Sequence, residues 1–312
     1  MLIRTPQPAS VPAALAAPAA GAAAPWRDQF IQQLSQMSMP LCAVSTVHPP
    51  LQKSALPTPR VRNCVCRGLW ASLPNNARNP APRNPAIYES DLPVFTTDVR
   101  MEKAWEISAS GGPIEAVWWA ADAGTQWRVR GRAWLLGPEA ETPAGEEART
   151  AIQKHMRWIP GSAAGSTGRT PTAATTSPLE ASTGWSWSRE ITAHFGNLSP
   201  GMRGSFRNPA PGQPRPARGK EGNSSPGEGL GDPVDNDHLD DPEARANFRV
   251  CVIVPEEVDQ CDLSKGDDPR RWLYTYVGEG DEDKHGDEED RAAKVKDADE
   301  IINGWAKKEI WP

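Results

Sequence analysis

Three arginines lie in a ten-residue stretch that otherwise has the composition of a β-strand. The stretch is PRVRNCVCRG, residues 59–68, and its arginines are Arg60, Arg62 and Arg67. Valine and cysteine suit a pleated, half-buried surface, whereas guanidinium groups on a strand need an anion or solvent. The stretch therefore raises the question of which anion these arginines bind.

A second polar group follows in FTTDVRMEK, residues 95–103, where a strand ends and a helix begins. It contains two threonine hydroxyls and two cations, Arg100 and Lys103. A phosphate suits this set, because guanidinium forks bind its oxygens in pairs, hydroxyls donate to it and the first helical turn offers free N–H groups. The two segments together indicate phosphate binding, and solvation of the arginines at a sheet edge is the structural alternative.

Other patterns indicate neither a metal site nor a catalytic group. Cys64 and Cys66 point to one face of a strand, but no second Cys or His pair at metal spacing supports a zinc site. We therefore expect core cysteines. We expect His194 to be a hydrogen-bonded structural histidine rather than a catalytic one, and we assign no side chain as a general base.

Short hydrophobic runs separated by turn residues predict the elements that must position these groups. The expected helices are 25–37, 99–108 and 144–158. The expected strands are 41–47, 60–73, 93–98, 114–121, 126–137, 247–254 and 270–277. Because successive strands have short connections and no βαβ units, we expect an antiparallel sheet or barrel.

Composition divides the chain into one folded domain and several low-complexity segments. Residues 1–24 are mostly alanine and proline, and we expect them to form a disordered extension. We assign residues 25–312 to a single domain with low-complexity insertions at 159–183, 215–242 and 279–300. The last insertion contains an acidic run, which is typical of a solvated segment.

Charge, hydropathy and cysteine content limit the class of protein. A net charge of −6 argues against a general nucleic-acid binder, which is normally basic. No run of about 18 apolar residues exists, so we expect no membrane span. Five cysteines, an odd number, follow no secretory signal, so we expect reduced thiols and a cytoplasmic location. A mitochondrial leader is the alternative, with Arg4 as the single basic residue before Arg27.

The order of several motifs resembles the pyridoxamine 5′-phosphate oxidase-like proteins, a family of FMN-binding split β-barrels. These motifs are PRVRNCVCRG, VFTTDVRMEK, QWRVRGRAWLL, NFRVCVIVPEEVD, RRWLY and GWAKKEIWP. The chain is most similar to the branch that carries APWR, FTTDVRMEK, LSPGMRGSFRNP and a WP ending. The resemblance covers residues 25–137, 185–214, 245–277 and 303–312. It implies that the anion is the phosphate of FMN.

The resemblance also implies a set of cofactor-binding residues. Arg62 and Arg67 occupy the two basic positions of the family's FMN-binding strand, and Lys103 occupies the position of a phosphate-binding lysine. The arginine usual before that lysine is Glu102 here, and we expect Arg100 to compensate. The full set of expected cofactor contacts is Arg62, Arg67, Thr96, Thr97, Arg100, Lys103, Gln126 and Arg271.

The substrate side departs from the family pattern. True pyridoxamine 5′-phosphate oxidases carry Arg-x-His-x-Arg near the C-terminus, where this chain has Asp267 and Pro269 before the last arginine. The segment LSPGMRGSFRNP lies where the true oxidases bind substrate phosphate, and its candidates for that role are Arg203, Ser205 and Arg207. Capping a helix and binding the barrel is an equal alternative for these three residues.

The expected fold is mainly β, of the α+β class: an antiparallel FMN-binding split β-barrel of about six strands with small flanking helices. The resemblance implies a homodimer with FMN at its interface, and we expect a small-molecule substrate, phosphorylated or not, and no nucleic-acid partner. We expect an oxidoreductase that uses FMN to oxidise this substrate. A non-catalytic FMN-binding module, for flavin storage or sensing, is the alternative, and a barrel that binds haem or a deazaflavin is a third.

Overall fold

The structure, a computed structural model, describes residues 22–50, 52, 56–159, 162, 183–214, 232–278, 295–296 and 298–312. Most of the expected extension at 1–24 and large parts of the three expected insertions lie outside these residues.

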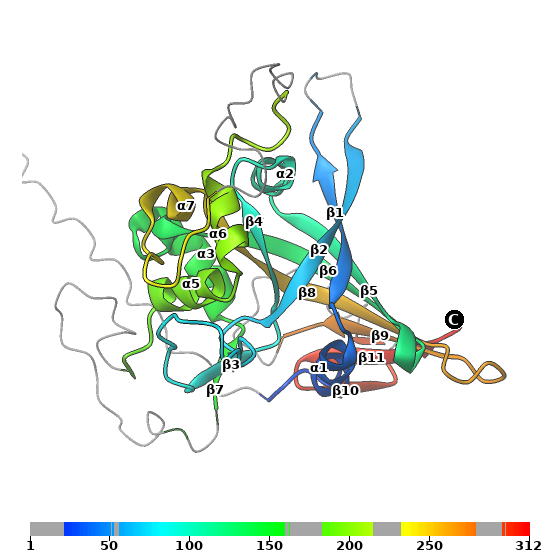
Figure 1. Ribbon diagram of the computed structural model, residues 1–312. Helices are drawn as coiled ribbons and strands as arrows, with labels where there is room; N and C mark the ends of the chain where they lie inside the picture. Colours follow the sequence, from blue (N-terminus) through cyan, green and yellow to red (C-terminus); the bar gives the residue numbers. More distant parts are fainter. Residues whose placement is uncertain are drawn as a thin grey trace, which may run out of the picture.

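Six strands close into an antiparallel barrel (Figure 1). They are β1 (Leu41–His48), β2 (Thr58–Leu69), β4 (Pro93–Asp98), β5 (Pro113–Ala120), β6 (Thr125–Leu136) and β8 (Phe248–Asp262). The strands pair in the order β1–β2–β4–β8–β6–β5, and β5 pairs with β1 to close the ring. The predicted architecture, an antiparallel split barrel, is confirmed.

Further strands extend this sheet and form a small second one. The extension runs from β8 through β9 (Arg270–Tyr276) and β11 (Trp305–Ile310) to β10 (Glu300–Ile302). The second sheet pairs β3 (Tyr88–Ser90) with β7 (Met156–Trp158). The C-terminal motif GWAKKEIWP therefore supplies strand β11, which pairs with β9 over its whole length.

Helices lie at both ends of the barrel and along one side. In Figure 1, α1 (Arg27–Gln36) and α2 (Glu102–Ser110) lie at opposite ends. The side near β4 and β8 is covered by α3 (Glu146–Gln153), α5 (Trp187–Gly196), α6 (Pro200–Gly204) and α7 (Pro242–Asn247). Short 3-10 turns span Ala121–Ala123, Pro138–Glu141, Pro143–Gly145 and Ser205–Arg207.

Two hydrophobic clusters stabilise this arrangement. The first fills the barrel, where Phe30 of α1 packs edge-on against Trp118 and Trp127 at centroid distances of 5.1 and 5.5 Å. The second lies between the outer face of the barrel and the helical layer, where Trp70 stacks on Trp187 at 5.4 Å. The second cluster fixes the helical layer against β4 and β8, and this layer supplies one wall of the site described below.

Strand β8 is longer than the sequence predicts. The expected strand ends at 254, whereas β8 continues to Asp262. Pro255 lies where the register between β6 and β8 shifts, after Arg130, and a strand tolerates proline at such a bulge. A Cβ atom on Gly131 would lie 2.0 Å from the Val254 carbonyl oxygen, so the close approach of β6 and β8 here requires glycine.

Two other predicted boundaries differ from the structure. The helix expected at 144–158 ends at Gln153, and the residues after it form β7. Residues 232–242 belong to an expected low-complexity insertion, yet Val234 is buried and its carbonyl accepts a hydrogen bond from Arg203. Pairing of distant segments therefore decides both regions, and composition does not reveal it.

Within the described ranges, none of the helices has the length and hydropathy to cross a membrane.

Candidate cofactor site

A cavity between β2 and β4 brings most of the predicted phosphate-binding residues together. The two strands are in register at Leu69–Pro93 and Cys66–Phe95, and no register pair joins them beyond Cys66. A cavity of about 510 Å³ lies there, bounded by β2, β4, the start of α2 and the segment 198–211. Its lining includes Arg67, Thr96, Thr97, Lys103 and Ser205.

Arg67 presents an uncompensated cation to this cavity. It lies in the register shift between Cys66 and Leu69, beside Gly68, whose φ of +98° favours glycine. The Arg67 Nε atom has no hydrogen-bond partner, and no carboxylate in the described part of the chain pairs with the guanidinium. Burial lowers the pKa of Arg67. A partly buried cation without a counter-charge is stabilised when an anion binds beside it.

Lys103 approaches the same cavity from the first turn of α2. Its Nζ donates to Thr97 Oγ1 at 3.2 Å and lies 2.8 Å from Met101 Sδ. Burial is the main cause that lowers the pKa of Lys103, and among the described residues no carboxylate forms an ion pair with it. With Arg67 and Thr96, these groups place two cations and two hydroxyls at one cavity, which is the set that binds a phosphate monoester.

The carboxylate in the cavity lining belongs to Asp98, and Arg100 neutralises it. Arg100 Nη2 lies 2.7 Å from Asp98 Oδ2, and Arg100 Nε lies 3.0 Å from Oδ1. Arg100 itself is not part of the lining. The structure therefore places Arg100 behind Asp98 rather than in direct reach of a ligand, which differs from the compensating role that the sequence predicts.

Arg62 does not line the cavity either. Side chains alternate along a strand, so Arg62 shares the face of Cys64 and Cys66, which belong to the barrel core, whereas Arg67 is on the other face. Arg62 Nη2 donates to Oε2 of the buried Glu106 at 2.7 Å, and its Nη1 contacts Thr46 Oγ1. In the structure Arg62 is thus paired with a protein carboxylate, and its contact with the FMN phosphate stays a prediction.

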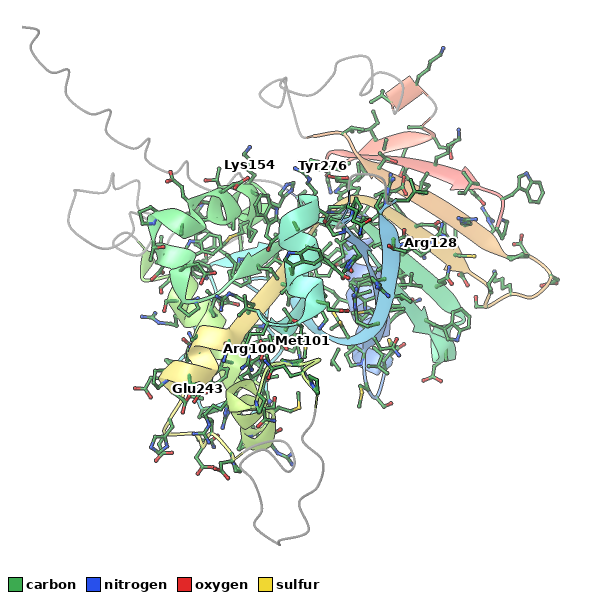
Figure 2. All side chains as sticks on the ribbon, turned by 90° about the horizontal axis from the view of Figure 1, so that it is seen from above. Arg100, Met101, Arg128, Lys154, Glu243 and Tyr276 are labelled. Atoms are coloured by element: carbon green, nitrogen blue, oxygen red, sulfur yellow. The ribbon has the colours of Figure 1, made fainter. Side chains whose placement is uncertain are left out.

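Gln126 and Arg271 lie together on another part of the barrel surface. Both are in register with Cys261 of β8, so they lie at the same level on the two strands that flank β8. Arg271 pairs with Asp259, which Arg128 also contacts, and neither Gln126 nor Arg271 lines the cavity. Figure 2 shows Arg128 on a different side of the barrel from Arg100.

Comparison with known proteins finds a family model that is similar to the part of the chain containing most of this site. Residues 23–137 match the family model described as pyridoxamine 5′-phosphate oxidase, FMN-binding domain. This part of the chain is similar to the FMN-binding domain of that family. The resemblance found in the sequence and the prediction of FMN as cofactor are thereby confirmed.

One solved structure agrees with the fold of the chain, and a second, more distant one is also similar. A pyridoxamine 5′-phosphate oxidase-related, FMN-binding protein from Nostoc punctiforme is 20% identical with a TM-score of 0.50, and the match covers 93% of this chain and 100% of that chain. PhzG from Burkholderia lata, solved with tetrahydrophenazine-1-carboxylic acid, is 11% identical with a TM-score of 0.35, over 91% of this chain and 89% of that chain. No curated protein matches the chain.

The three candidate substrate residues differ in their surroundings. Ser205 lines the cavity. Arg203 is fully buried and donates to the carbonyl groups of Gly196, Leu198 and Val234. Arg207 Nη1 lies 3.3 Å from Asp241 Oδ2, and its Nη2 donates to the Asp232 carbonyl. The surroundings of the two arginines favour the structural alternative, in which they hold the 198–211 segment in place.

Sequence reasoning missed several residues that shape the site. Glu106 is fully buried and accepts from Thr46 at 2.5 Å as well as from Arg62, yet in the sequence it is one of many helix glutamates. The cavity lining missed in the sequence comprises Asn63, Cys64, Val65, Asp98, Met101, Leu198, Met202, Phe206, Asn208, Pro209 and Pro211. Strand alternation could have indicated Asn63 and Val65, since they share the face of Arg67.

Proposed function

We propose that FMN binds with its phosphate in the cavity between β2 and β4, and that the chain is an oxidoreductase acting on a small molecule. The observation that carries the site is the pair of cations, Arg67 and Lys103, which line one cavity and form no ion pair with a carboxylate among the described residues. FMN, when bound, supplies hydride transfer and reoxidation by O₂.

In this proposal the residues of the chain bind and orient the cofactor. Arg67 donates its guanidinium fork to two phosphate oxygens, and Lys103 adds a second positive charge from α2. Thr96 and Thr97 supply hydroxyl donors at the edge of β4. The apolar side chains of Leu198, Met202 and Phe206 form the facing wall and exclude water from the phosphate.

We further propose that FMN lies at the interface of a homodimer. Gln126 and Arg271 are expected cofactor contacts, yet they lie outside the cavity of their own chain. A second copy packed against the outer face of the barrel would bring its Gln126 and Arg271 to the cofactor of the first. The cytoplasmic location expected from the sequence stays a prediction.

Mixing two defective variants tests the shared site. Arg67→Met removes the cation that a chain places beside its own bound phosphate. Arg271→Met removes the contact that a chain gives to the cofactor of its partner. We expect each variant alone to bind FMN weakly, whereas a heterodimer of the two contains one intact site. Titration of the purified heterodimer should show wild-type affinity with about one FMN per two chains. The matched control places both substitutions in the same chain and mixes it with wild type. If the site is shared, this dimer has no intact site and should bind FMN weakly.

A heterodimer that binds FMN only weakly would contradict a site shared between two chains.

A specific observation keeps the non-catalytic alternative open. Arg203 and Arg207, the candidate substrate cations, are both bonded to protein groups. A flavin storage or sensing module needs no substrate cation. Anaerobic mixing with candidate amines separates the two functions, because an oxidoreductase loses its yellow colour with its own substrate and a storage module keeps it.

Turnover of pyridoxine phosphate and pyridoxamine phosphate should be poor. Asp267 and Pro269 replace the arginine and histidine of the true oxidases, and losing one bidentate phosphate contact costs a few kcal/mol, roughly a hundredfold in affinity. The measurement is peroxide release under saturating FMN beside an authentic oxidase. Rates comparable to those of the authentic oxidase would contradict this prediction.

A further inference from the structure

A carboxylate lies in the wall of the proposed phosphate site. Asp98 ends β4, lines the cavity and is almost completely buried. Its negative charge acts to raise the pKa of the nearby Lys103, whereas burial, the larger effect, lowers that pKa. A free carboxylate at this position would repel a phosphate dianion, and the repulsion is strong where water is excluded.

Arg100 occupies both oxygens of this carboxylate. Nε and Nη2 reach Oδ1 and Oδ2 at 3.0 and 2.7 Å, and the backbone N–H of Arg100 donates to Oδ1 at 2.8 Å. Planar, two-point contacts of this kind are the strongest ion pairs that side chains form. The negative charge of Asp98 is therefore neutralised by a side chain that is not part of the cavity lining.

The same guanidinium also holds the opposite wall. Arg100 Nη1 donates to the Asn208 carbonyl at 2.9 Å, and Nη2 donates to the Phe206 carbonyl at 3.1 Å. Phe206 and Asn208 both line the cavity. Figure 2 shows Arg100 and the adjacent Met101 between the barrel strands and the helical layer. One side chain thus connects the end of β4 with the segment that faces it.

We infer that Arg100 is a positioning residue that makes the site selective for a flavin carrying a phosphate, by neutralising Asp98 and fixing the 206–208 wall. This inference rests on the proposed phosphate site. It assigns Arg100 no contact with the ligand, in contrast to Arg67 and Lys103. Selectivity for FMN over riboflavin then depends on a residue outside the cavity lining.

The ratio of the dissociation constants for riboflavin and FMN tests this role. Arg100→Ala frees the Asp98 charge, and we expect the preference for FMN to fall at least about tenfold. In the double variant Arg100→Ala/Asp98→Asn the charge is gone, and the preference should return to within about threefold of wild type. A purely structural role of Arg100 would weaken both flavins equally and would leave the ratio unchanged.

Two further variants keep the test decisive. Arg100→Gln retains an amide donor for the wall carbonyls but loses the charge, so it should show the same loss of preference if Arg100→Ala unfolds. Asp98→Asn alone should not lower the preference, because it removes a negative charge and leaves the Arg100 cation in place. An unchanged ratio in Arg100→Gln would overturn the inference. A double variant Arg100→Ala/Asp98→Asn whose ratio stays as low as that of Arg100→Ala would overturn it as well. Wild-type protein that binds FMN no better than riboflavin would instead contradict the phosphate site itself.

Discussion

Replacing Arg62 with methionine is expected to lower the free energy of unfolding by about 3–5 kcal/mol, the usual cost of breaking a buried ion pair. Glu106 has no exposed surface, and Arg62 is the cation that contacts it at 2.7 Å. Without Arg62, a charged or newly protonated carboxyl group stays buried beside β1. Urea unfolding at neutral pH measures the loss.

This loss should depend on pH through Glu106. Burial alone would raise the pKa of Glu106, but hydrogen bonds with Thr46, His48 and Arg62 outweigh burial and hold the pKa below its usual value. A carboxyl group whose folded pKa is depressed stabilises the fold above its unfolded pKa and loses this contribution as the pH falls through its folded pKa. The wild-type advantage over Arg62→Met should therefore shrink in acid.

A paired substitution separates this structural role from a role in cofactor binding. Arg62→Met/Glu106→Gln removes the buried charge together with its partner, and it should recover much of the stability lost in Arg62→Met. FMN affinity should change little in the double variant. A stable Arg62→Met protein with weakened FMN binding would instead support the direct phosphate contact that the sequence predicts.

Replacing Arg67 with methionine should weaken FMN binding by roughly 10- to 150-fold, since a charge-assisted contact contributes about 1.5–3 kcal/mol. Methionine retains an unbranched apolar side chain, so the wall of β2 stays filled. The folded apo-protein should lose no stability, because Arg67 forms no ion pair within the described chain. Riboflavin, which has no phosphate, should bind both proteins alike.

Arg60 provides the matched control for this substitution. It lies on the same strand and is exposed to solvent, and it does not line the cavity. Arg60→Met changes the net charge by the same amount, so any long-range electrostatic effect appears in both variants. Equal loss of FMN affinity in Arg60→Met and Arg67→Met would refute the local phosphate contact.

The strands of the barrel could be predicted from the sequence because their signals are local. β4 spans Pro93–Asp98, as its short hydrophobic run and flanking turn residues indicate, and short connections predict the antiparallel order. The extent of β8 could not be predicted, since Pro255 is compatible with a strand only because β8 bulges directly after it, where it faces Gly131 of β6. That compatibility depends on a pairing between segments that are far apart in the chain.

The site was predicted in part, for a similar reason. Arg67, Thr96, Thr97 and Lys103 come from two segments that each look like half of a phosphate site, and the cavity joins them. The spacing of five between Arg62 and Arg67 already indicates opposite faces of a strand, and that signal outweighs the shared residue type. The partner of Arg62 is a helix residue that only the three-dimensional fold brings to it.

The two arginines near 205 illustrate the limit of motif comparison. Arg203 and Arg207 stand in the segment where the family binds substrate phosphate, but each is bonded to protein oxygen atoms. A motif gives only the order of residue types and not the partners of each side chain. One acceptor of Arg203 is the Val234 carbonyl, which lies in a segment that composition assigns to an insertion. Residue type alone therefore cannot separate a ligand contact from a structural one.

Titration of the apo-protein with FMN and with riboflavin tests the phosphate site most directly, with binding followed by the loss of flavin fluorescence. Two charge-assisted contacts, from Arg67 and Lys103, predict saturation at one FMN per chain and an affinity at least about a hundredfold above that for riboflavin. Equal affinity for the two flavins would contradict the assignment of the cavity between β2 and β4 to the phosphate.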